Sequence, residues 1–318
     1  MPKPIANAIE QADSILLTTT ELDGDAVGAI VALALTIEQL WPSKSVVCVT
    51  HEALPERYGC IVPDASLFSV AVHTEPRSVD LAIVLDGDPE RLRTATPHYQ
   101  AARLRGMIDH HKSSVAVECD VTLHDAGAAS TTELILRLCD HWNAHVAPEI
   151  AQAIYAGLVF DTSIFRYGHT APGTLRMAAR LIETGFDHRR VVEKVLLEQD
   201  AEKVRLKGRM IDRMKLRFGG QYAWAALTAA EVSNAETGGL VDDLVFVTGV
   251  EVGALLVEKN DGRVKVSLRS RGAVDVADVA QKCSSTGGGH PRAAGVMLTG
   301  GLDDVSERLS AQIKGFFS

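Results

Sequence analysis

Apolar residues with two different spacings alternate along the first part of the chain. Runs typical of strands cover residues 14–20, 45–50, 80–86 and 105–109. Between them lie segments with helical spacing, such as Ala26 to Leu40. Strands that alternate with helices predict a mostly parallel sheet with helices on both faces.

The pattern changes further along the chain. Helical spacing dominates from residue 129 to about residue 218, and strand-like runs then return. The turn Asn260-Asp261-Gly262 between two alternating runs is a strong hairpin signal. We therefore expect an α/β protein of three parts, namely a first domain at 1–190, a helical linker at 191–218 and a smaller α/β domain at 219–318.

The linker region is strongly basic. The segment from Lys203 to Arg217 carries seven basic residues and one acidic residue, Asp212. Runs of like charge usually form solvated faces. We interpret the segment as a solvated helix that joins the two domains, and direct contact with phosphate is the alternative.

Charge and composition exclude several classes of protein. A formal net charge of −9, from 32 basic and 41 acidic residues, disfavours a protein that coats long nucleic acid, because such binding depends on many Lys and Arg contacts to phosphate. The five cysteines form no Cys-x-x-Cys pair, which argues against a disulfide framework and a thiolate zinc site. No apolar run approaches the roughly 20 residues that cross a bilayer. The N-terminal residues lack a secretory signal pattern, so we expect a cytoplasmic protein that does not bind membranes.

Carboxylates follow two of the predicted strands. Asp23 and Asp25 stand two residues apart after the first strand, so in extended backbone both would leave it on the same side. Asp86 ends the third strand. In α/β sheets the carboxyl ends of the strands are where ligands bind. Taken alone, Asp-x-Asp at a helix start is more often an N-cap, but the pattern at several strand ends favours a cation site.

A carboxylate and two imidazoles follow a further strand. Asp109, His110 and His111 reach the same edge of the predicted sheet, and Asp161 closes an apolar helical run. Histidine with several carboxylates suits Mn²⁺ or a similar divalent ion. The alternatives are a pair of loop histidines and a capping role for Asp161, and the agreement of three strand ends favours the metal.

These motifs together resemble the DHH family of phosphoesterases, in its type with a C-terminal DHHA1 domain. The resemblance covers nearly the whole chain and rests on the motifs quoted next. They are DGDAVG at 23–28, the strand end at Asp86, DHH at 109–111, YAGLVFDTSIFRY from 155, VKVSLRSRG from 264 and STGGGHPRAAG from 285. Within the family, the chain is most similar to the NrnA-like enzymes, which degrade very short oligoribonucleotides and can remove the 3′-phosphate of phosphoadenosine phosphate.

The resemblance implies a site and roles for its residues. It implies two metal ions, usually Mn²⁺, with Asp86 bridging them, Asp109 orienting His110 and His111 near the scissile phosphate. The implied metal ligands are Asp23, Asp25, Asp86, His110 and Asp161. Residues 1–190 would then be the DHH catalytic domain and 219–318 the DHHA1 domain.

The resemblance also assigns the substrate's terminal phosphate to the DHHA1 domain, which closes over the metals. Three consecutive glycines allow close backbone approach to an anion, although such a run is more often a flexible turn. Guanidinium groups bind phosphate through two donors at once. The residues expected to bind the phosphate are Arg269, Arg271, Gly287, Gly288, Gly289 and His290.

The first motif departs from the family pattern. The family has His four residues before the first Asp, and Thr19 occupies that position here. We therefore carry two interpretations. The first is a manganese-dependent phosphoesterase that acts on short single-stranded RNA, linear dinucleotides and phosphoadenosine phosphate, and the second is a nucleotide-binding module with weak or lost catalysis. The oligomeric state, a homodimer included, stays open.

Overall fold

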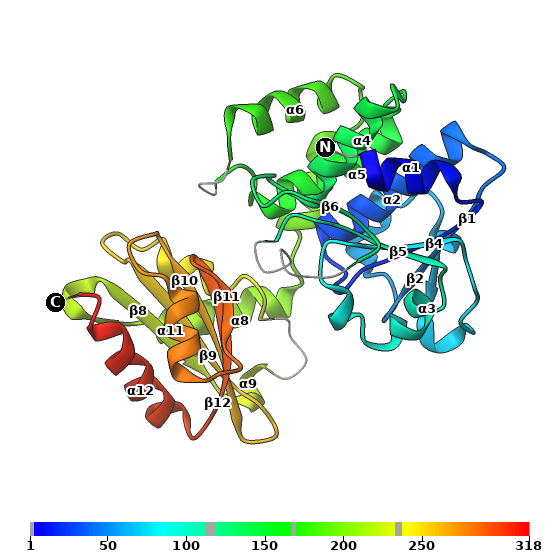
Figure 1. The fold of residues 1–318 in the computed structure, drawn as a ribbon. Coiled ribbons are helices and arrows are strands. Elements are labelled where there is room, and N and C mark those ends of the chain that lie inside the picture. The colour runs from blue at the N-terminus through cyan, green and yellow to red at the C-terminus, as the bar shows by residue number, and fades with distance from the viewer. Residues whose placement is uncertain (1–2, 112–118, 167–169, 233–236, 318) are drawn as a thin grey trace. The chain divides into compact units, whose positions relative to one another are not determined.

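The chain divides into two units, residues 1–198 and 199–318, each with its own sheet and core. The computed structural model describes residues 3–111, 119–166, 170–232 and 237–317. Figure 1 shows the two units in sequence colours. Among the described residues, no helix is long and apolar enough to cross a membrane.

The first unit contains a six-stranded sheet in which every neighbouring pair is parallel. This confirms the predicted sheet, including the strand at 45–50, and adds two short edge strands that the apolar pattern did not predict. In spatial order the strands are β3 (Phe68–Val70), β2 (Ser45–Thr50), β1 (Ser14–Thr18), β4 (Leu81–Leu85), β5 (Leu104–Asp109) and β6 (Val121–His124).

Helices cover both faces of this sheet, as predicted. Alternate residues of each strand enter two separate cores because successive side chains point to opposite faces. Ile15 and Leu17 of β1 pack with α1, α2, α4 and α5, whereas Leu16 packs on the α3 side. The helices are α1 (Lys3–Gln11), α2 (Gly24–Leu40), α3 (Thr96–Gln100), α4 (Thr131–His141), α5 (Pro148–Asp161), α6 (Pro172–Ile182) and α7 (His188–Val192), followed by a π-helical turn at Glu193–Leu197.

The second unit is a mixed six-stranded sheet. All its neighbouring strands are antiparallel except the pair β8 and β9. The expected hairpin is present, since β9 and β10 are joined through Gly262, whose φ is +77°. In spatial order the strands are β11 (Gly288–His290), β12 (Ala293–Thr299), β10 (Arg263–Ser270), β9 (Val252–Glu258), β8 (Tyr222–Leu227) and β7 (Lys215–Arg217).

Helices lie on both faces of the second sheet. One core joins the strands to α11 and α12, and a separate core joins them to α8 and α10. The arginines of the basic segment, such as Arg205 and Arg209, are exposed as expected. Its helix ends at Asp212, and Leu206 and Met210 on the other face are buried in the second unit. The helices are α8 (Ala201–Asp212), α9 (Ala229–Val232), α10 (Asp242–Val245), α11 (Val276–Cys283) and α12 (Leu302–Lys314).

Candidate metal centre

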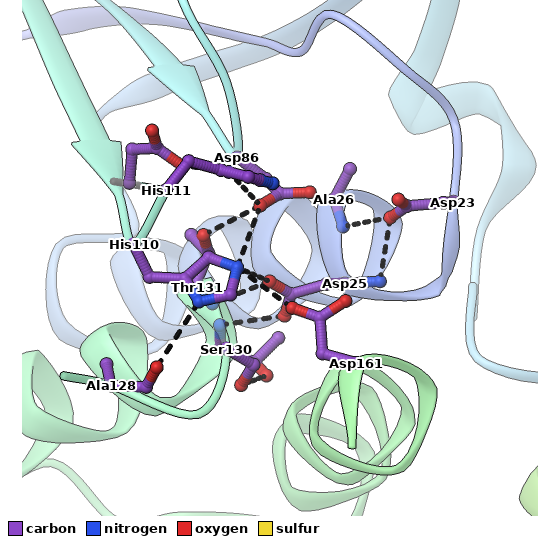
Figure 2. Close-up of polar contacts among 12 residues, drawn as sticks. Asp23, Asp25, Ala26, Asp86, His110, His111, Ala128, Ser130, Thr131 and Asp161 are labelled. Atoms are coloured by element: carbon purple, nitrogen blue, oxygen red, sulfur yellow. Dashed lines mark hydrogen bonds and ion pairs between the residues drawn. The ribbon is translucent and has the colours of Figure 1, made fainter. Parts of the chain in front are cut away.

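Three carboxylates converge on one imidazole at the carboxyl edge of the first sheet. Nε2 of His110 lies 2.9 Å from Oδ2 of Asp161, 3.7 Å from Oδ1 of Asp86 and 4.0 Å from Oδ2 of Asp25. Figure 2 shows the three side chains pointing toward His110 from separate elements. Sequence positions far apart therefore supply one compact set of oxygen and nitrogen donors.

Nε2 of His110 and Oδ2 of Asp161 are buried, and apart from their 2.9 Å ion pair with each other neither atom has a hydrogen bond assigned among the described residues. Nδ1 of His110 faces the carbonyl oxygen of Ala128 at 3.3 Å. A ligating histidine characteristically donates its other ring nitrogen to such an acceptor, which fixes the orientation of the ring. This arrangement and the oxygen-rich surroundings fit a divalent cation.

Asp25 is held by the beginning of α4. Its Oδ1 accepts from the amide of Thr132 at 2.9 Å and its Oδ2 from the amide of Thr131 at 2.5 Å, and its side chain is fully buried. The first amides of a helix have no partner within the helix and attract negative charge. An ideal Cβ at Gly157 of α5 would lie 2.3 Å from Oδ1 of Asp25, so this glycine makes room for the carboxylate.

Sequence reasoning did not identify the contribution of α4, although a signal for its start is present. Ser130 accepts from the amide of Glu133, and Glu133 accepts from the amide of Ala129. Ser-x-x-Glu before an apolar run is the pattern of a capping box. The pattern predicts where the helix begins, but not that its free amides face Asp25.

Asp23 and Asp25 do not leave a strand together, so the expectation from extended backbone was wrong. β1 ends at Thr18, Asp23 is the N-cap of α2, and Asp25 lies in the first turn of that helix. Oδ1 of Asp23 accepts from the amides of Asp25 and Ala26, both at 3.0 Å. The capping alternative is therefore correct for this oxygen, and Figure 2 shows the same contacts.

Asp86 has a left-handed backbone, with φ at +58°. Its amide donates to the carbonyl oxygen of Ile108, and its Oδ1 accepts from the hydroxyl of Thr131 at 3.0 Å. Asp is one of the few residues that tolerate this backbone region. The turn after β4 thus directs a nearly buried carboxylate toward both histidines.

The expected pairing of Asp109 with His110 is wrong. Oδ1 of the fully buried Asp109 lies 2.8 Å from Nδ1 of His111 instead. Along a strand end, residues two apart share a face whereas adjacent residues do not, which explains the exchange. Two groups of potential ligand atoms result, with all atoms of a group within 4.8 Å: Asp86, His110 and His111, and Asp25, His110 and Asp161.

Burial and the neighbouring charges perturb the titration of the centre. Burial, followed by repulsion from Asp161, raises the pKa of Asp23 to about 7 and that of Asp25 to about 6. Burial lowers the pKa of His110, but hydrogen bonding and attraction from Asp161 outweigh burial and raise it to about 9. Without a bound cation, the centre therefore holds protons at neutral pH.

Asp161 is the last residue of α5 and precedes an unusual turn. Ser163, Ile164 and Phe165 all have left-handed backbones, with φ between +50° and +62°. The hydroxyl of Thr162 accepts from the amide of Phe165 and donates to the carbonyl of Leu158. The turn therefore ends the helix at the carboxylate.

Two of the expected phosphate-binding residues lie beside the first residue of β12 in the second unit. Arg269 of β10 and His290 of β11 both pair with Ala293 of β12, so their side chains leave the same face of the sheet. Nε of Arg269 donates to Oδ1 of Asp242 at 2.7 Å, so part of this guanidinium is already engaged. Arg271 and His290 are exposed.

Close packing requires glycine at two of the three positions from Gly287 to Gly289. An ideal Cβ at Gly287 would lie 2.2 Å from the carbonyl oxygen of Ala280, and one at Gly289, whose φ is +140°, would lie 2.4 Å from that of Ala293. Gly288 has open space at the same position. Close packing thus explains two of the three glycines without an anion.

Comparison with known proteins identifies both units. The model of the DHH family, N-terminal domain, matches residues 14–158, and the model of the DHHA1 domain matches residues 219–318. The bifunctional oligoribonuclease and PAP phosphatase NrnA of Thermus thermophilus is 28% identical over 303 residues, which cover 94% of this chain and 88% of that protein.

Solved structures have the same fold. An exopolyphosphatase-related protein from Bacteroides fragilis matches with a TM-score of 0.88 and 23% identity, over 99% of this chain and 95% of that one. RecJ of Thermus thermophilus, solved in complex with Mn²⁺, matches with a TM-score of 0.60 and 13% identity, over 99% of this chain and 55% of that one. The predicted α/β architecture of both units is thus confirmed.

Proposed function

The chain belongs to the DHH family and carries a DHHA1 domain, and we propose that it is a phosphoesterase that depends on a divalent metal. Its proposed reaction is the degradation of short oligoribonucleotides and linear dinucleotides to mononucleotides. The observation that supports the proposal most directly is the convergence of Asp25, Asp86 and Asp161 on Nε2 of His110. The relative from Thermus thermophilus is described as an oligoribonuclease and PAP phosphatase. Removal of the 3′-phosphate of phosphoadenosine phosphate is accordingly included in the proposal.

The proposed ligands would surround one metal ion well and a second ion only in part. Asp25, Asp86, His110 and Asp161 would hold one ion, and Mn²⁺ is the ion that we propose. A second ion would depend on Asp23 together with Asp86, because the hydroxyl of Thr19 donates to the carbonyl of Glu21 at 3.0 Å instead. We therefore expect two ions of unequal affinity. When bound, such ions activate a water molecule and neutralise charge on the phosphate.

The other residues of the centre hold the carboxylates in position or offer a hydrogen bond to the substrate. The α4 amides and the Thr131 hydroxyl hold Asp25 and Asp86 in place before any ligand arrives. Burial lowers the pKa of His111, but its hydrogen bond to Asp109 and that carboxylate's charge raise it above the ordinary value overall. We propose that His111 donates a hydrogen bond to the scissile phosphate.

The DHHA1 domain is proposed to bind the substrate's terminal phosphate. Arg271 and His290 are exposed donors near the glycine run, and Arg269 would have to share its guanidinium with Asp242. Cationic and backbone donors of this kind suit a phosphate monoester better than an uncharged chain end. A short substrate with one terminal phosphate fits the chain's net charge of −9, which does not favour long nucleic acid.

Cytoplasmic location remains a prediction, and a homodimer remains one of the open possibilities for the oligomeric state. The second function, a nucleotide-binding module with lost catalysis, is supported by the engagement of Thr19 with Glu21. Both functions predict binding of short RNA, and only the first predicts product.

The test is release of mononucleotide from a 5′-phosphorylated diribonucleotide, with and without Mn²⁺, by the protein and by Asp86→Asn. Asn tolerates the left-handed backbone of Asp86 but removes its charge. We expect metal-dependent release that falls at least about 100-fold in the variant. Asp88→Asn is the matched control, because Asp88 lies two residues away and only caps a short helix.

Wild-type release by Asp86→Asn would refute the assignment of Asp86. Tight binding of the dinucleotide without any product from the unaltered protein would instead establish the binding module.

A further inference from the structure

Arg93 has a left-handed backbone that glycine adopts more readily. Its φ is +52°, and it begins the short 3₁₀ helix η5 (Arg93–Ala95) after β4. Asn and Asp are enriched in this backbone region, whereas a long side chain such as Arg is uncommon there. Strain of this kind persists where the surrounding structure enforces it, and it clusters at functional sites.

The guanidinium of Arg93 makes two contacts across the edge of the sheet. Nη2 donates to Oε1 of Glu21 at 2.7 Å, and Nη1 lies 3.0 Å from Nε2 of His51. Arginine can only donate, so the hydrogen bond to His51 uses Nε2 as the acceptor. Oε1 of Glu52 lies 3.4 Å from the same nitrogen. Nδ1 of His51 is buried with no hydrogen bond assigned among the described residues.

The contacts join the connections that follow β1, β2 and β4. Glu21 lies two residues before Asp23, His51 follows β2, and Arg93 lies seven residues after Asp86. A second link lies closer to the centre, where the hydroxyl of Thr20 donates to the carbonyl of Asp86 at 3.4 Å. The two segments that carry Asp23 and Asp86 are thereby tied at two places.

Stability does not explain the presence of Arg93. The side chains of Arg93 and Glu21 are 53% and 51% exposed, and exposed ion pairs contribute little to stability. A glycine at this position would also relieve the backbone strain. An arginine at position 93 therefore needs an explanation other than its contribution to folding stability.

We propose that Arg93 is a positioning residue of the metal centre. Its left-handed backbone directs the guanidinium to Glu21, whose carbonyl oxygen accepts from the hydroxyl of Thr19 and which lies two residues before Asp23. Asp23 is thereby placed relative to Asp86. The inference rests on the proposed function, since it concerns the weaker of the two proposed metal positions, which depends on Asp23 together with Asp86.

The test measures Mn²⁺ binding and thermal unfolding of Arg93→Gly in the full chain. We expect an unfolding temperature in EDTA no lower than that of the unaltered protein. We also expect the weaker Mn²⁺ site to lose up to about tenfold in affinity, which is the lower end of the loss seen when a direct partner of a metal ligand is removed. The protein is titrated with Mn²⁺ alone, and electron paramagnetic resonance measures the free Mn²⁺. Asn143→Gly is the matched control, because Asn143 has a φ of +51° and follows α4, away from these contacts.

Glu21→Gln separates the two effects of the substitution, since it weakens the contact but leaves the backbone of residue 93 unchanged. It should lower Mn²⁺ affinity in the same direction at an unaltered unfolding temperature. Wild-type Mn²⁺ affinity in either variant would overturn the role of Arg93. Absence of Mn²⁺ binding by the unaltered protein would instead overturn the proposed metal centre, so the two failures are distinguishable.

Discussion

Asp23, Asp25, Asp86 and His110 are neighbours at one site, where Asp25 and Asp86 are buried and Asp23 and His110 are partly buried. Burial is the largest cause of the raised pKa of each carboxyl group, and the negative charges around it raise it further. Repulsion of this kind is relieved either by protons or by a cation. Because metal ligands must lose their protons, the same groups that favour a cation make its binding depend on pH.

The first prediction concerns the metal-free protein between pH 5 and pH 9. Asp23 has a pKa of about 7 when folded, above its ordinary 3.8, so the folded state binds more protons than the unfolded state. His110, at about 9 against 6.5, acts in the same direction. This contribution to the free energy of unfolding is present below the ordinary pKa values and is lost as the pH rises through the folded ones.

We therefore expect the free energy of unfolding in EDTA to fall over this range and Mn²⁺ affinity to rise over it. Urea denaturation and Mn²⁺ titration at each pH measure the two quantities. Asp120→Asn, on the surface of the same unit, is the control substitution. Mn²⁺ affinity that is independent of pH would contradict the proposed ligand set.

At the scale of elements, α4 determines the conformation of Asp25. The first two amides of this helix donate to its two carboxylate oxygens. Asp86, in contrast, accepts from a hydroxyl that can rotate. Replacing Asp25 by Asn and replacing Asp86 by Asn should therefore change the free energy of unfolding by different amounts.

The second prediction is that Asp25→Asn is less stable than the unaltered protein by about 1 to 3 kcal/mol, because the amide nitrogen of Asn cannot accept and leaves one buried N–H unsatisfied. Asp86→Asn should be as stable as the unaltered protein or more so, because it removes one of several like charges. Urea denaturation in EDTA at pH 8 compares the three proteins. Equal stability of the two variants would show that the α4 amides do not hold Asp25.

At the scale of the whole molecule, the two units have separate hydrophobic cores. Ile15 and Leu33 belong to the first unit, and Val266 and Leu309 belong to the second. Units with separate cores can unfold in separate transitions. A ligand stabilises only the folded state that binds it.

The third prediction is that calorimetry resolves two transitions and that Mn²⁺ raises only one. At about 100 times the dissociation constant, a bound ion adds about 2.7 kcal/mol to the unit that holds it. Asp86→Asn should abolish the shift and leave the other transition in place. A single transition that moves as a whole would contradict independent unfolding of the units.

The elements were largely predictable because their patterns are local. The strand predicted at 45–50 has those bounds, and the strands predicted at 80–86 and 105–109 lie within one residue of the predicted ends. The short edge strands β3 and β6 were not predicted, since a few residues carry too little periodicity. The basic helix ends earlier than expected because residues 215–217 pair with β8, a contact that periodicity cannot show.

The family, the parallel sheet and the set of acidic and imidazole side chains at its carboxyl edge could all be predicted from the order of the amino acids. These features depend on residue type and on alternation along the chain, which are local properties. The partners of these polar side chains, in contrast, follow from the fold: Asp109 faces His111, Asp23 caps α2, α4 holds Asp25 and Arg93 reaches Glu21. A polar side chain finds its partner according to its own direction and to the segments that folding brings beside it. Asp25 and Thr132, for example, are 107 positions apart in the sequence and meet only in the folded chain.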